Sequence, residues 1–205
     1  MPILDIPRDT PLEQFPAEGQ LAIIDLEFTT WEGAWQRRWA GADEWREIVQ
    51  IGAVIVEGET FQMTRPPFEC LVRPVRNPVL SSYFVDLTGI KQEDVDQEGV
   101  AFVAALQRLA DYLSDVKLAI FNGDDGQILR ENCEINDLPF PFETLSLRNF
   151  RPHLARSLQV DVSRLTSSEL PELAGLAAPG HAHTAADDCL SIASSLAVWR
   201  SERRL

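Results

Sequence analysis

Apolar residues gather in short runs separated by polar or proline-rich segments, and several of these runs have the composition of β-strands. The first covers about 21–27, the second covers 47–57, and a third is expected near 61–73. A fourth short run, 117–121, is followed closely by a glycine. Runs of β-branched and aromatic residues that end at turn-forming residues are typical of strands. The sequence therefore predicts strands at these four positions.

Helical spacing of apolar positions is clearest in residues 100–114. There the apolar side chains recur every three or four residues, at Phe102, Leu106, Leu109 and Leu113. Ile128 and Leu129 indicate another helix, and a helical run of about 184–203 closes the chain. Strands followed by alternating helices and strands are typical of an α/β layered domain, with a mixed central sheet flanked by helices.

Length and composition fit one globular domain. The chain has 205 residues, 45% of them hydrophobic and 24% charged, which is enough to bury a full core. Residues 1–20 are rich in proline and charge and predict an irregular lead-in, so we assign 21–205 to a single domain. We find no signal-peptide pattern and no run long enough to span a bilayer, and the three cysteines lack zinc or disulfide spacing. A cytoplasmic location is the expectation.

The net charge of −14 bears on the partners that the chain can bind. It argues against a protein that grips long duplex nucleic acid through its phosphates. It does not exclude a small catalytic groove that binds the end of a strand, because metal ions bound by several of the acids would neutralise part of this negative charge. An acidic interaction protein is a further possibility, which the charge alone favours.

Two carboxylates close the first predicted strand, in the sequence Leu-Ala-Ile-Ile-Asp-Leu-Glu-Phe. Asp25 and Glu27 are two positions apart, so in a strand their side chains point to the same face. Like charges held side by side repel each other unless a cation lies between them, and a divalent metal with oxygen ligands is the simplest such cation. An exposed strand end is the alternative explanation, and this motif alone does not exclude it.

Two later segments contain the other groups that a metal site would need. Asn-Gly-Asp-Asp-Gly follows the strand 117–121 and contains Asp124 and Asp125, at a position where α/β sheets usually carry their sites. By itself this segment is also typical of a turn. The second segment, 180–189, contains His183 and Asp188 around a helix start, where Thr184 and Asp187 fit a capping box.

These three segments, in this order, resemble the DnaQ-like, or DEDDh, family of 3′-to-5′ exonucleases over roughly residues 20–200. Asp25 and Glu27 match the family's first motif, and His183 with Asp188 match its last motif, a His and an Asp separated by four residues. The middle aspartate of the family is followed by apolar residues three and four positions later. Asp125 satisfies this with Ile128 and Leu129, and Asp124 is the fallback.

Other segments narrow the resemblance to the Eri-like and KapD-like exoribonuclease branch. They are Asp-Leu-Glu-Phe-Thr-Thr-Trp-Glu-Gly from Asp25 and Asp-Asp-Cys from Asp187. The sequence Leu-Thr-Gly-Ile from Leu87 looks like a segment of the family as a whole. One departure is the sequence Phe-Asn-Gly before Asp124, where that branch usually has an aromatic residue followed by glycine.

The resemblance implies a ribonuclease H-like fold and a two-metal hydrolysis of phosphodiesters. It implies that Asp25, Glu27, Asp125 and Asp188 hold two Mg²⁺ ions, with Mn²⁺ as a substitute, and that His183 is the general base. It also implies that the terminal nucleotide is held by backbone around Phe28, Thr29, Leu87 and Thr88. Phe28 and Leu87 as plain core residues are the alternative.

The activity that the resemblance implies is release of nucleoside monophosphates from the 3′ end of single-stranded nucleic acid. RNA or short oligoribonucleotides are favoured as the substrate. Two alternatives remain open: a DNA exonuclease of the proofreading or repair type, and a non-catalytic nucleic-acid-binding module on the same fold. The sequence does not indicate an oligomeric state.

A cluster of tryptophans follows the first motif. Trp31, Trp35 and Trp39 recur every four residues with Arg37 and Arg38 between them, so in a helix the three indoles would share one face. Such a face could stack on unpaired bases while the arginines meet phosphates. Packing of the same side chains against the domain is the other interpretation, and a glycine within the run weakens the prediction of a helix.

Overall fold

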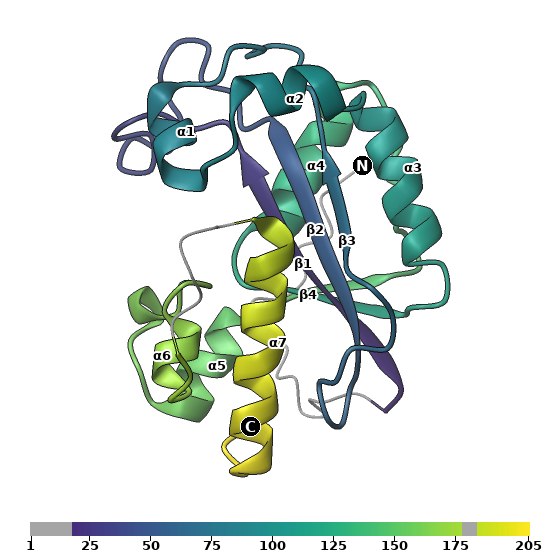
Figure 1. The fold of residues 1–205 in the computed structure, drawn as a ribbon, viewed down its shortest axis with the longest axis vertical. Helices are drawn as coiled ribbons and strands as arrows, with labels where there is room; N and C mark the ends of the chain where they lie inside the picture. The colour runs from purple at the N-terminus through teal and green to yellow at the C-terminus, as the bar shows by residue number, and fades with distance from the viewer. Residues whose placement is uncertain (1–17, 178–183) are drawn as a thin grey trace.

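The central element is a five-stranded mixed sheet in a computed structural model that describes residues 18–177 and 184–205 (Figure 1). The strand order is β3-β2-β1-β4-β5. The strands are β1 (Gln20–Phe28), β2 (Ile48–Glu57), β3 (Phe68–Leu71), β4 (Leu118–Phe121) and β5 (Ser146–Asn149). β1 pairs antiparallel with β2 and parallel with β4. The carboxyl ends of β1 and β4 therefore point towards the same edge of the molecule.

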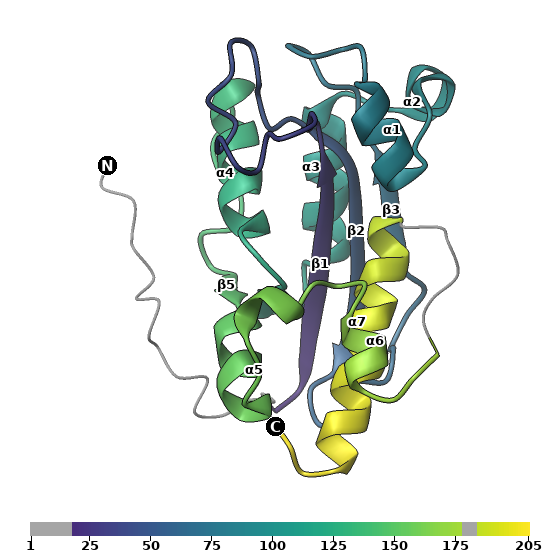
Figure 2. The same cartoon turned by 90° about the vertical axis from the view of Figure 1, so that its left-hand side faces the viewer.

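Helices cover both faces of this sheet (Figure 2). One face packs against α3 (Phe102–Tyr112) and α4 (Asp125–Ile135). The opposite face packs against α5 (Arg151–Leu158), α6 (Leu170–Leu173) and the long α7 (Ala185–Ser201). Two short helices, α1 (Ser82–Thr88) and α2 (Gln92–Glu98), enclose a small third cluster of buried residues with β2, and a 3₁₀ turn, η1, covers Val162–Arg164. The prediction of a mixed sheet flanked by helices is confirmed.

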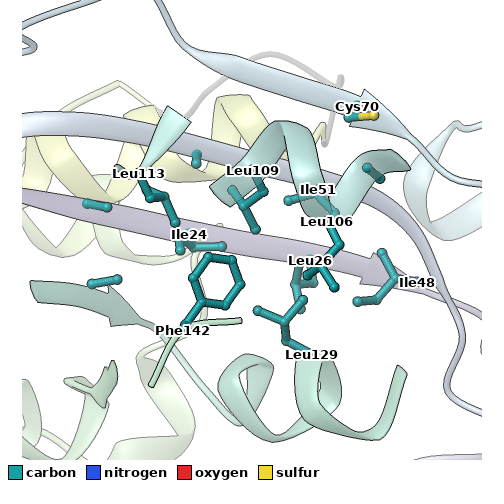
Figure 3. Packing of buried hydrophobic residues seen from close by; sticks show 14 of the residues in the cluster. Ile24, Leu26, Ile48, Ile51, Cys70, Leu106, Leu109, Leu113, Leu129 and Phe142 are labelled. Atoms are coloured by element: carbon teal, nitrogen blue, oxygen red, sulfur yellow. The ribbon is translucent and has the colours of Figure 1, made fainter. Parts of the chain in front are cut away.

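β1 is the strand at the centre of the fold, and it is buried on both faces. Ile24 and Leu26 face α3 and α4, where Leu106, Leu109, Leu129 and Phe142 surround them (Figure 3). Leu21 and Ile23 face the opposite way, towards α7. Because side chains alternate along a strand, Asp25 and Glu27 continue the row that faces α7.

The strand and helix predictions agree with the structure to within a few residues, with one clear exception. The third strand covers 68–71 instead of 61–73, because Pro66 and Pro67 cannot donate to a sheet ladder. Six elements were not predicted: α1, α2, β5, α5, η1 and α6. Within the part of the chain that the structure describes, no helix has the length and apolarity needed to cross a membrane.

The tryptophan-rich segment after β1 does not form an α-helix. Residues 32–39 form consecutive turns, and Gly33, Arg38 and Trp39 have positive φ angles of 70°, 54° and 52°. Left-handed backbone at these positions cannot continue a right-handed helix. The indoles of Trp31, Trp35 and Trp39 therefore do not share one helical face.

Candidate active site

Asp25 and Glu27 lie near the carboxyl end of β1, on the face that α7 covers. The four residues before Asp25 are fully buried, and Asp25 itself is 9% exposed. The parallel pairing of Ile23 with Ile120 brings the end of β4 alongside. The chain then turns at once into α4, whose first residue is Asp125. Pairing of β1 with β4 thus brings the second segment of the predicted site next to the first.

Helix α7 supplies Asp188, and two residues of β2 allow its first turn to lie on the sheet. Gly52 is paired with Asp25, and a Cβ at Gly52 would lie 2.2 Å from the backbone carbon of Ala185. Gln50, which is paired with Glu27, accepts a hydrogen bond from the Ala185 N–H at 2.9 Å. Only a glycine leaves room for this approach, and the glutamine side chain holds the helix end in place.

The start of α7 is also capped from within its own sequence. The Thr184 hydroxyl accepts a hydrogen bond from the Asp187 N–H at 3.1 Å, which is the N-cap half of the predicted capping box. The Asp188 N–H donates to the Thr184 carbonyl at 3.0 Å. Asp188 therefore occupies the first turn of the helix, and its carboxylate reaches the acids of β1.

Asp25, Glu27 and Asp188 form a compact carboxylate cluster in which one oxygen from each lies within 4.8 Å of the others. This is the one such group of possible metal-binding side chains in the described parts of the chain. Hard oxygen ligands at this spacing suit a divalent cation such as Mg²⁺. The residues present therefore fit a divalent metal ion.

The electrostatics of the cluster also indicate that a cation belongs there. Burial and the neighbouring acids Asp125, Glu27 and Asp188 raise the pKa of Asp25 well above its ordinary value. Burial, Asp188 and Asp125 raise the pKa of Glu27 to about 8. Carboxylates that repel each other in a buried site favour protonation unless a cation neutralises them. Without a metal ion, the protein thus holds these acids at a free-energy cost.

Asp125 and Asp124 differ sharply in their surroundings. Asp125 is buried at 9% exposure, whereas Asp124 is exposed at the N-cap position of α4. Burial raises the pKa of Asp125 to about 6, although backbone N–H groups and Arg151 oppose the shift. Because Asp125 also raises the pKa values of Asp25 and Glu27, it is the aspartate of this pair that lies with the cluster.

Arg151 is a cation beside the cluster that the sequence analysis did not identify. Its guanidinium hydrogen-bonds the backbone carbonyl of Asn122 and, at 3.2 Å, the Asn122 side-chain oxygen. Asn122 is itself buried, and its amide donates to the Leu165 carbonyl at 2.9 Å. The charge of Arg151 lowers the pKa values of Asp25 and Asp125. Arg151 therefore fixes the turn that carries Asp125 and partly offsets the negative charge.

Two other sequence predictions have different outcomes. His183, the predicted general base, lies outside the described residues, immediately before Thr184. Among the predicted substrate-binding residues, Thr29 and Thr88 are buried, Phe28 is partly exposed and Leu87 is 54% exposed. The Thr88 hydroxyl donates to the Phe84 carbonyl at 2.9 Å and accepts from the Ile90 N–H at 3.1 Å. Whether these four residues bind a nucleotide stays a prediction.

Gln50 and Gly52 were also missed in the sequence, although one signal was present. A glycine in the middle of a β-branched strand often marks a close approach of another backbone, and Gly52 follows Ile51 within such a run. No comparable sequence signal points to Gln50 or Arg151. Their roles depend on partners 135 and 29 positions away in the chain.

The fold and the site define a class: a ribonuclease H-like α/β domain with a carboxylate cluster that fits a divalent metal ion, where β1 and α7 meet. Comparison with known proteins agrees with this class. The family model described as Exonuclease, RNase T, matches residues 22–196. The chain therefore belongs to this exonuclease family, in its DnaQ-like, DEDDh group.

Individual relatives show how far the similarity extends. The 3′-5′ exoribonuclease 1 of Rattus norvegicus is 26% identical over 182 residues, covering 84% of this chain and 50% of the rat protein. "Probable 3′-5′ exonuclease KapD" of Bacillus subtilis is 29% identical over 141 residues, covering 64% of each chain. The chain thus spans about half the length of the mammalian relative that it matches.

Solved structures show the same fold. The crystal structure of the nuclease domain of 3′hExo, a DEDDh family member bound to rAMP, superposes with a TM-score of 0.76. It is 24% identical in sequence, and the match covers 90% of this chain and 93% of that domain.

Proposed function

We propose that this protein is a metal-dependent 3′-to-5′ exonuclease that releases nucleoside monophosphates from single-stranded nucleic acid, with RNA or short oligoribonucleotides as the preferred substrate. The observation that carries the proposal is the partly buried cluster of Asp25, Glu27 and Asp188, with one oxygen from each within 4.8 Å of the others. The cluster lies in a chain of the exonuclease family. Acids that repel one another so strongly reduce stability, and a catalytic metal site explains why they are present.

Each site residue has a role in this proposal. Asp25, Glu27, Asp125 and Asp188 would hold two divalent ions, Mg²⁺ with Mn²⁺ as a substitute, in the arrangement that the family resemblance implies. Bound ions supply a nucleophilic water at neutral pH and stabilise charge on the phosphate. His183 takes the proton from the attacking water, since an imidazole has a pKa near neutrality. Backbone near Phe28, Thr29, Leu87 and Thr88 positions the terminal nucleotide.

The preference for RNA is supported by the names of relatives. The rat, mouse and human proteins that match 84% of this chain are each named 3′-5′ exoribonuclease 1. Acting on a strand end also agrees with the net charge of −14, which opposes binding along a long duplex. A DNA exonuclease is the second candidate, because hydrolysis assisted by metal ions acts on the phosphate and does not require a sugar 2′-hydroxyl.

Matched single-stranded RNA and DNA oligomers, labelled at the 5′ end, test this proposal. With Mg²⁺ or Mn²⁺ we expect stepwise shortening from the 3′ end and release of mononucleotides, faster on RNA. EDTA should abolish cleavage of both the RNA and the DNA oligomer. Asp25→Asn should reduce the rate by about a thousandfold or more with little loss of folding, because it removes a ligand and a charge from the metal site.

The matched control for this variant is Asp111→Asn, which makes the same change at an exposed aspartate on α3. It should retain wild-type activity. Activity of Asp25→Asn near the wild-type level would remove Asp25 from the site. Faster cleavage of DNA would make the DNA exonuclease the correct assignment, and binding of oligomers without any cleavage would indicate a non-catalytic module.

A further inference from the structure

The loop between β1 and β2 contains four of the five tryptophans of the chain, and the exonuclease chemistry uses none of them. We call residues 30–46 the tryptophan loop. Figure 2 shows it beyond the carboxyl end of β1, beside the upper end of α4 and facing α1. It therefore begins where the strand that carries Asp25 and Glu27 ends.

Aromatic rings form a continuous series from the end of β1 to the surface of this loop. The ring of Phe28, the residue after Glu27, lies 5.7 Å from the ring of Trp39. The Trp39 ring lies 5.8 Å from that of Trp35 in an edge-to-face arrangement. Trp35 ends the series and is 70% exposed. The ring of Trp35 thus packs against Trp39 on one side and is exposed to solvent on the other.

Packing of the domain explains Trp39 only in part and does not explain Trp35. The indole N–H of Trp39 is buried without a hydrogen-bond partner in the described parts of the chain, and the Trp39 backbone has a left-handed φ of 52°. A buried N–H without a partner and a left-handed backbone at a non-glycine residue both cost free energy. Packing alone does not account for a segment with both features. An exposed tryptophan held on such a segment is more consistent with binding.

Arginines surround these rings despite the acidic character of the chain. The Arg46 guanidinium lies 5.5 Å from the centre of the Trp39 ring, and Arg76 lies 4.0 Å from that of Trp45. Trp45 is 41% exposed. Arg38, between Trp35 and Trp39 in the sequence, is exposed. Positive groups interleaved with exposed rings are typical of surfaces that bind single-stranded nucleic acid.

The loop is anchored to the rest of the domain, so it presents a fixed surface. At its base the Thr29 hydroxyl accepts a hydrogen bond from the Glu47 N–H at 2.9 Å. The buried carboxylate of Glu47 accepts hydrogen bonds from the N–H groups of Val75, Arg76 and Asn77. Within the loop Arg37 pairs with Glu44, and Arg46 pairs with Glu131 of α4.

We infer that the tryptophan loop binds the part of a single-stranded substrate that lies 5′ to the terminal nucleotide, with Trp35 stacking on a base and Arg38 and Arg76 meeting phosphates. The inference rests on the proposed function, since it takes the strand to end at the carboxylate cluster. The partner is a single strand because its unpaired bases have free faces on which an indole can stack.

Binding and hydrolysis of ligands of different lengths test this surface. Trp35→Ala should weaken binding of a labelled ten-nucleotide single strand by about 5- to 150-fold, the range for loss of one base–aromatic stack. Fluorescence anisotropy measures this in protein that also carries Asp25→Asn, so that no cleavage occurs. In protein with Asp25 intact, Trp35→Ala should leave hydrolysis of a p-nitrophenyl ester of a nucleoside 5′-monophosphate unchanged, because this ester reaches only the carboxylate site.

Trp35→Tyr keeps an aromatic ring and should restore most of the binding, and Val103→Ala, an exposed apolar residue on α3, is the control. In protein that carries Asp25→Asn and has Trp35 intact, the affinity for the single strand should rise as the ligand is lengthened from two to about six nucleotides. If Trp35→Ala bound the single strand as tightly as Val103→Ala does, the inference would be overturned. It would also be overturned if affinity did not depend on the length of the ligand. Failure of the protein with Asp25 intact to hydrolyse the ester counts against the proposed function instead, and leaves the binding result interpretable.

Discussion

At the scale of single residues, neighbours in the sequence have different surroundings and thus different chemistry. Asp124 and Asp125 are adjacent, yet one is exposed and the other is buried among like charges. The distinction follows from the helix that starts at Asp125 and places Ile128 and Leu129 in the core. The family resemblance favours Asp125 for the same reason, because Ile128 and Leu129 follow it by three and four positions. The role of Asp125 as a ligand stays a prediction.

His183 is the residue whose role the sequence spacing alone supports. We expect His183→Ala to reduce the rate of exonuclease cleavage by about 10²- to 10⁴-fold, the usual contribution of a general base. Metal affinity, measured by isothermal titration calorimetry, should be largely kept. His153→Ala on α5 is the matched control and should behave like the unmodified protein. Loss of metal binding in His183→Ala would make this histidine a ligand.

At the scale of elements, the site depends on how closely one helix approaches one strand. The N-terminus of α7 lies against β2 because Gly52 has no side chain and because Gln50 accepts the Ala185 N–H. Gln50 also donates to Glu69 of β3 at 2.5 Å, so its own orientation is fixed. The position of Asp188 relative to Asp25 therefore depends on residues of β2, a strand that carries none of the acids of the cluster.

Gly52→Ala tests this contact. The added methyl group would lie 2.2 Å from the Ala185 backbone, so α7 must shift and carry Asp188 with it. We expect a loss of about 1–3 kcal/mol in the free energy of unfolding, together with a rate of cleavage at least about tenfold lower. Chemical denaturation and the oligomer assay measure the two effects.

Gly126→Ala is the matched control, because a methyl group there would lie 3.4 Å from the Phe121 ring, in ordinary contact. This change within α4 should leave stability unchanged or slightly raised. If Gly52→Ala had full activity, the close approach of α7 would not be required for the site.

At the scale of the whole molecule, negative charge is concentrated where three buried elements meet. β1, α4 and α7 each bring at least one acid to this region, and the nearby cation that the structure provides is Arg151. Burial and mutual repulsion raise the pKa values of Asp25 and Glu27, so the charge of Arg151 does not offset the cost of ionising these acids. The metal-free protein should therefore be less stable than its hydrophobic core would allow.

This imbalance predicts how stability depends on pH. The folded protein raises the pKa of Glu27 from 4.5 to about 8 and that of Asp125 from 3.8 to about 6. Across this range the folded state binds more protons than the unfolded state, so the free energy of unfolding falls as pH rises. In EDTA we expect the melting temperature to fall by about 4 °C or more between pH 5 and pH 8.

Saturating Mg²⁺ should cancel this fall, because bound cations favour the ionised carboxylates. Asp25→Asn should flatten the pH dependence in EDTA, whereas Asp111→Asn on the surface should not. Thermal denaturation followed by circular dichroism checks these outcomes. An equal pH dependence in both variants would assign the effect to general repulsion in a chain of net charge −14.

The sequence by itself determined the main strands of the sheet, the main helices that cover it, and the three segments that carry the candidate site. These features are local: apolar periodicity sets the elements, and spacings of two and five residues place side chains on one face or around one helix start. The shape of the tryptophan loop, the contact of Gly52 with Ala185 and the position of Arg151 were decided by the tertiary structure. They depend on backbone turns and on partners far away in the chain, and no local pattern encodes such distances.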